Sequence, residues 1–118
     1  MAVARNAAAQ AKENHAINIH RQSLPEPFDG WEAEFAKVTM QPGPGYAPHR
    51  HKGFGLGYVI DGQFRFGLDG QPERVLGAGE VFYEPPGALH TISASASNTR
   101  AASILAIIIS KRGETVAQ

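Results

Sequence analysis

The sequence predicts an all-β protein. From Ala16 onward the chain reads as short apolar or alternating runs broken by glycine and proline, and no stretch repeats apolar residues at helical spacing. Two Asp-Gly dipeptides, Asp61-Gly62 and Asp69-Gly70, are typical of tight turns between strands. Regularly spaced short strands with such turns indicate a sandwich or a barrel.

The N-terminal half divides at its turn residues. Residues 1–14 are rich in alanine and are predicted to be a tail, either disordered or a short helix. Residues 16–24 are predicted to form an outer strand, and residues 25–30, with two prolines, a loop. Alternation over residues 32–40 predicts a second strand. The proline- and glycine-rich residues 41–48 form the next loop.

The middle of the chain is predicted to hold a β-hairpin. Residues 57–60 and 63–68 flank Asp61-Gly62, so we expect these two runs to pair. Three glycines within residues 52–57 predict a mobile loop before the hairpin. Asp69-Gly70 then turns the chain into another short strand at residues 73–76.

The C-terminal half supplies the last strands. Residues 80–84 form a strand that ends at Pro85-Pro86-Gly87, and this turn leads into the strand that carries His90. The apolar run of residues 103–110 contains several β-branched isoleucines and is too short to cross a bilayer. It is predicted to be a buried central strand.

Composition excludes several classes of function. The chain of 118 residues fits one domain, and its 11 basic and 11 acidic side chains cancel. With no basic stripe, nucleic acid and membrane surfaces are not expected partners. The absence of cysteine excludes disulfides, thiolate ligands and thiol catalysis. The first residues lack the apolar core of a signal peptide, so we expect a soluble, cytoplasmic protein.

Three histidines are the chemically most informative residues. His49 and His51 are two apart, so on a strand both imidazoles would point to one face. His90 follows the Pro85-Pro86-Gly87 turn. Imidazole is a common ligand of zinc, iron, copper and nickel, and three imidazoles leave coordination positions free for water or substrate.

The spacing around these histidines resembles the two motifs of the cupin superfamily. Gly43, five residues, then His49 and His51 match the first motif, which continues through a glutamate and six residues to a glycine, here Gly62. The second motif is matched by Gly79, then, after five residues, Pro85, then Gly87 two positions on, and His90 three positions after that. The resemblance covers residues 35–110. It implies a single cupin jelly-roll (double-stranded β-helix) barrel of two antiparallel sheets over residues 15–112, with a C-terminal tail at 113–118.

The resemblance also implies a metal site, with two departures from the pattern. Cupin histidine ligands project into the barrel mouth, so His49, His51 and His90 become the predicted ligands of one iron, zinc, nickel or copper ion. The motif's glutamate falls on Gly55, which cannot bind a metal, and Ala94 stands where the family often has asparagine. The loss of the glutamate removes an anionic ligand from the site.

Glu84 is a candidate replacement. In the family, the position before the proline of the second motif is usually apolar and faces inward. An inward carboxylate is costly to bury without a cation or a donor. Glu84 is therefore a candidate fourth ligand, partner orienting a histidine, or general base. The alternative is that it lies in solvent at the rim.

Other residues are assigned more general roles. Four aromatic residues are expected to line the barrel interior or pack its core: Tyr58, Phe64, Phe66 and Phe82. Tyr46 and Phe54 flank the histidine pair and are candidates to gate the mouth. His15 and His20 are expected at the surface, and Arg65 on the outer face. The sequence contains no phosphate-binding loop, nucleophile elbow or other cofactor motif.

Two functions remain open from the sequence. The first is a metalloenzyme similar to small three-histidine oxygenases, such as thiol and diketone dioxygenases, acting on a small chelating or anionic substrate; a zinc-type hydrolase or isomerase would use the same site. The second is a non-catalytic ligand-binding or sensory barrel. In either case the resemblance implies a homodimer and a small-molecule ligand.

Overall fold

Residues 13–114, which the computed structural model describes, form nine strands and no helix. In chain order the strands are β1 (His15–Ser23), β2 (Trp31–Met40), β3 (His49–Arg50), β4 (Phe54–Asp61), β5 (Gln63–Leu68), β6 (Arg74–Gly77), β7 (Val81–Glu84), β8 (Leu89–Ser95) and β9 (Ala102–Lys111). The predicted all-β class is confirmed. The predicted tails, residues 1–14 and 113–118, lie largely outside the described residues.

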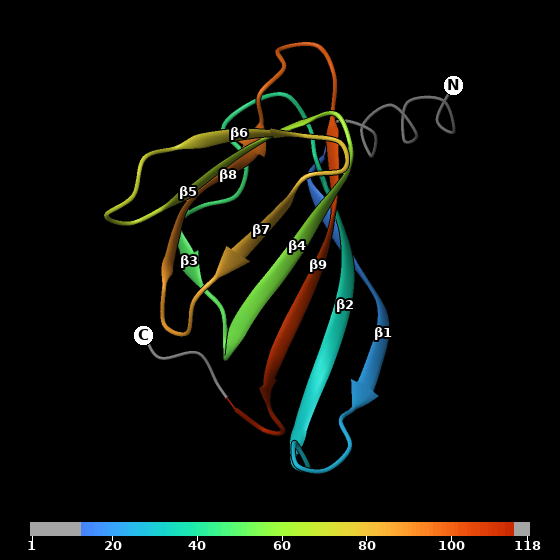
Figure 1. Ribbon diagram of the computed structural model, residues 1–118. Coiled ribbons are helices and arrows are strands. Elements are labelled where there is room, and N and C mark those ends of the chain that lie inside the picture. The colour runs from blue at the N-terminus through green and yellow to red at the C-terminus, as the bar shows by residue number, and fades with distance from the viewer. Residues whose placement is uncertain (1–12, 115–118) are drawn as a thin grey trace.

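The strands form two antiparallel sheets. One has the order β1-β2-β9-β4-β7 and the other the order β3-β8-β5-β6. Figure 1 shows the long strands of the first sheet side by side, with β5, β6 and β8 grouped at the upper left. Within the described residues, no helix has the length and apolar character needed to cross a membrane.

The first sheet is arranged as its apolar pattern predicts. β9 lies between β2 and β4 and pairs with both along most of its length, which confirms the central strand predicted at residues 103–110. β1 pairs only with β2 and is exposed throughout, so the predicted outer strand is also confirmed. His15 and His20 lie on this exposed strand.

The predicted hairpin around Asp61-Gly62 is wrong. β4 pairs with β7 and β9, whereas β5 pairs with β6 and β8 in the other sheet. The Asp-Gly step, where Gly62 has a φ of 80°, is therefore a corner that carries the chain between the sheets. In a flat hairpin, Val59 and Phe64 would lie in the same sheet. The corner instead places them in two facing sheets, where both side chains are 0% exposed.

The predicted mobile loop at residues 52–57 is also corrected. β4 begins at Phe54, so Gly55 and Gly57 belong to a paired strand. Neither has a positive φ, unlike Gly53 before them. Their role is spatial, because each is paired with an inward-facing side chain of β7: Gly55 with Glu84, and Gly57 with Phe82.

An aromatic cluster fills the space between the sheets. Phe64 and Phe66 of β5 meet Phe82 of β7 with ring centroids 5.1 and 4.7 Å from that of Phe82. Met40 and Val59 are fully buried beside them. The cluster also supports the ring of His90 at the end of the core, 5.1 Å from that of Phe66.

Adding one methyl group at Gly57 is expected to destabilise the fold. A Cβ at this position would lie 1.9 Å from Cζ of Phe82, so the Gly57→Ala variant must displace an aromatic ring of the core. Overpacking of this kind costs about 1–3 kcal/mol of unfolding free energy. Urea denaturation measures it. Gly77→Ala is the control, because its added Cβ would meet only the Glu80 carboxylate at 3.6 Å; an equal loss in both variants would contradict the prediction.

Candidate metal centre

Strand pairing brings the first two histidines together. His49 of β3 lies directly opposite His90 of β8. Directly opposed residues of an antiparallel pair point to the same face of the sheet. Their ring centroids are accordingly 4.9 Å apart.

His51 completes the group from just beyond the end of β3. Its ring centroid lies 4.8 Å from that of His49 and 6.3 Å from that of His90. One potential ligand atom from each of the three residues lies within 4.8 Å of the others. The three histidines therefore form a cluster that could hold a metal ion.

Glu84 lies beside the cluster on β7 and not in solvent. The residue is 5% exposed. Its Oε1 contacts Nδ1 of His90, and its Oε2 lies 3.4 Å from Nε2 of His51. The alternative of a solvated rim position is wrong, because β7 directs Glu84 and Phe82 to the interior alternately with exposed Val81 and Tyr83.

The charges of the site favour an ionised Glu84 and a neutral His51. Burial opposes ionisation of Glu84, but contact with His90 and the nearby His51 and His49 outweigh it and lower the pKa of the carboxyl below its ordinary value. Burial lowers the pKa of His51 despite the opposing charge of Glu84, and the two other histidines lower it further. A neutral imidazole beside a carboxylate is the protonation state that binds a metal.

A backbone carbonyl orients His49. Its Nδ1 lies 2.7 Å from the carbonyl oxygen of Ala47, which accepts a hydrogen bond only if Nδ1 carries the proton. That tautomer leaves the lone pair of Nε2 free as a ligand. No pattern in the sequence pointed to Ala47, because it acts through its main chain.

The buried polar atoms of the site fit a cation. Both ring nitrogens of His90 and Oε1 of Glu84 are buried without a hydrogen bond, although His90 Nδ1 and Oε1 are in close contact. Such groups are rare in folded proteins, because each forfeits its hydration. A metal ion bound by one ring nitrogen of His90 would satisfy that nitrogen, and neutral imidazoles with one carboxylate suit iron, zinc, nickel or copper.

A cavity of about 380 Å³ opens onto the cluster. His49, His51, His90 and Glu84 form its polar end. The other walls are mostly apolar and come from both sheets and the loop before β3: Ala16, Val38, Tyr46, Ala47, Pro48, Phe82, Ser93, Ile104 and Ala106. The hydroxyl of Tyr46 is buried without a hydrogen-bond partner. The space therefore suits a small ligand with an apolar body.

The predicted aromatic residues divide between three places. Phe82 lines the cavity, and Phe64 and Phe66 lie in the core behind it. Tyr58 is 46% exposed and does not line the barrel, since alternation along β4 buries its neighbours Gly57 and Val59. Of the two predicted gating residues, Tyr46 lines this cavity.

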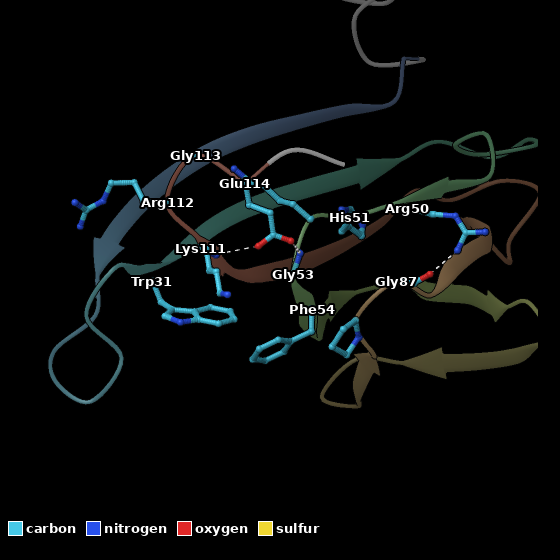
Figure 2. A pocket seen from close by; sticks show the side chains of 12 residues that line it. Trp31, Arg50, His51, Gly53, Phe54, Gly87, Lys111, Arg112, Gly113 and Glu114 are labelled. Atoms are coloured by element: carbon cyan, nitrogen blue, oxygen red, sulfur yellow. Dashed lines mark hydrogen bonds between the residues drawn. The ribbon is translucent and has the colours of Figure 1, made fainter. Parts of the chain in front are cut away.

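Phe54, the other predicted gating residue, lines a second, open hollow of about 620 Å³ that His51 also borders. In Figure 2, Glu114 accepts hydrogen bonds from the main-chain N–H groups of Gly53 and Lys111, at 2.9 and 3.1 Å, and so ties the loop after His51 to the end of β9. The basic residues around the hollow are Arg50, Lys52, Lys111 and Arg112. Glu114 also borders the hollow, and Lys52 is paired with Glu34 at 2.6 Å, so the basic residues are in excess beside His51.

Comparison with known proteins gives consistent results. No curated protein sequence matches significantly. Similar solved structures include a cupin 2 conserved barrel domain protein from Salinispora arenicola (22% identity, 81% of this chain and 75% of that chain, TM-score 0.61). A cupin superfamily protein from Desulfitobacterium hafniense is also similar (13% identity, 84% and 79%, TM-score 0.64). A structure from a study of the mechanism of oxalate oxidase matches at 22% identity (88% and 54%, TM-score 0.63).

These likenesses establish the fold, and the family is established from the sequence. The cupin domain model matches residues 36–108, which hold both motifs and all three histidines. The two antiparallel sheets agree with the jelly roll that the motif resemblance implied. The chain belongs to the cupin family.

Proposed function

We propose that this cupin is a metalloenzyme of the dioxygenase type, in which His49, His51 and His90 hold one divalent transition metal. The observation that carries the proposal is the geometry of the cluster: three imidazoles with potential ligand atoms within 4.8 Å of one another, at the polar end of a cavity. Three protein ligands leave coordination positions for a substrate. A bound iron ion would supply the redox chemistry.

The chain's own residues favour a small chelating or anionic substrate. The cavity volume of about 380 Å³ suits a small molecule, and its walls are mostly apolar. The Tyr46 hydroxyl is a buried donor without a partner, so it is available to a polar group of the substrate. Burial raises the pKa of Tyr46, which keeps this donor protonated. The basic residues beside His51 favour the approach of an anion.

Oxygen uptake tests the proposed activity. Protein loaded anaerobically with iron(II) is mixed with a small β-diketone or a small thiol carboxylate, and oxygen is followed with an electrode. We expect uptake that requires iron, substrate and His90, so the zinc-loaded protein and an iron-treated His90→Ala variant should show only the background of free iron. Metal and ligand binding without any uptake would instead identify a non-catalytic binding barrel.

A further inference from the structure

Two glycines of β4 leave space that two side chains of β7 occupy. Gly55 pairs with Glu84 and Gly57 with Phe82, so all four positions face the interior. A Cβ on Gly55 would lie 2.8 Å from Oε2 of Glu84, closer than real Cβ atoms approach. Gly55 has no positive φ, so its backbone conformation does not require a glycine. A Cβ at this position would instead require the carboxylate end of Glu84 to move.

The carboxylate that fills the space lies against two of the three histidines. Glu84 Oε2 is 3.4 Å from Nε2 of His51. Two ligand atoms each about 2.1 Å from one tetrahedral ion are separated by about 3.4 Å. Glu84 Oε1 meanwhile contacts Nδ1 of His90. Glu84 thus touches two of the three histidines from a strand that carries none of them.

We infer that Glu84 supplies the anionic ligand of the metal centre from β7, in place of the carboxylate that the first cupin motif puts on β4 at the position of Gly55. The inference rests on the proposed metal site. The two positions are directly paired across the sheet, so either strand can deliver a carboxylate to the same space. A glutamate at both positions would bring two like charges together, so one carboxylate in this space disfavours a second.

The site then has three imidazoles and one carboxylate, as in the motif, with the carboxylate on the neighbouring strand. One charge of a divalent ion is neutralised inside the barrel, and the remaining positive charge favours a monoanionic substrate over a dianion. The exchange also places the acidic ligand next to Phe82, on the strand that supports the cavity wall.

Moving the carboxylate from β7 to β4 by mutation tests the inference. The dissociation constant for Zn²⁺ is measured by calorimetry on metal-free protein, and Co²⁺ absorption reports the coordination. We expect the isosteric Glu84→Gln variant to bind Zn²⁺ at least about 10-fold more weakly, which is the loss that even an orienting partner produces. Its Co²⁺ absorption should also change, because a ligand and not only an orienting partner is removed. Glu84→Ala should be equally weak, and Gly55→Glu/Glu84→Ala should return to within about threefold of the parent. The exposed Glu80→Gln, four residues earlier, is the control and should bind as the parent does.

Each result decides the inference. If Glu84→Gln binds Zn²⁺ as tightly as the parent, or if the double variant folds and stays as weak as Glu84→Ala, Glu84 is not the relocated ligand. Thermal melting of the metal-free proteins shows whether the double variant folds, and if it does not, Glu84→Gln decides alone. Failure of the parent to bind any metal would overturn the proposed function and the inference together, whereas unchanged affinity only in Glu84→Gln would overturn the inference alone.

Discussion

Joint replacement of His49 and His51 by alanine is expected to lower the metal content from about one equivalent per chain to near zero. His90 and Glu84 would remain, and two protein ligands rarely hold a transition metal against buffer and chelator. The two removed rings have centroids 4.9 and 6.3 Å from that of His90, so His90 would be the one imidazole left in the cluster. Mass spectrometry of untagged protein after reconstitution and gel filtration measures the content.

The control for this prediction removes the same number of imidazoles elsewhere. The His15→Ala/His20→Ala variant changes two histidines of the exposed strand β1 and should keep the metal of the parent. Parallel loss of metal in both double variants would assign the metal to adventitious surface binding. Little metal in the parent itself, even after reconstitution, would leave a ligand-binding barrel as the better description.

Truncation of Phe64 is expected to have the largest effect on stability. The ring is 0% exposed, and its centroid lies 5.9 Å from that of Phe66 and 5.1 Å from that of Phe82. Because the surrounding sheets can close a cavity only in part, Phe64→Ala should lower the free energy of unfolding by about 3–5 kcal/mol. Guanidinium denaturation of the metal-free protein measures the loss.

Phe28→Ala provides the matched control, since Phe28 is 56% exposed in the loop before β2. We expect this variant to stay within about 0.5 kcal/mol of the parent. If Phe64→Ala lowers the free energy of unfolding by less than about 1 kcal/mol, the neighbouring side chains must fill the space that the ring leaves. The His90 ring lies 6.4 Å from that of Phe64, so a large loss should be accompanied by weaker metal binding.

The histidine cluster and the core are parts of one packing arrangement. The two inward-facing residues of β7 belong to the two regions. Phe82 packs in the aromatic cluster, and Glu84, two residues later, contacts His90. Gly55 and Gly57 of β4 provide the space for both side chains. Substitutions in this strand pair are therefore expected to change stability and metal affinity together, unlike those on β1.

Local sequence was sufficient for much of this protein. Alternation and β-branched residues predicted the strands, because side-chain direction repeats every two residues regardless of the partner strand. The spacing of His49, His51 and His90 relative to glycine and proline resembles the cupin motifs, and this resemblance predicted that the three histidines lie together. The run of residues 103–110 predicted a central strand through its apolar character alone.

Only the tertiary structure decided which strands pair and that Glu84 lies opposite Gly55. Asp61-Gly62 was predicted as a hairpin turn and is a corner between sheets, because the choice depends on which surfaces must be buried and not on the dipeptide. From the sequence, Gly55 in place of the motif glutamate indicates a lost ligand, and Glu84 could face the interior or the rim. Pairing of β4 with β7 joined these two observations, because contacts between residues 29 positions apart arise from strand register, which no local pattern encodes.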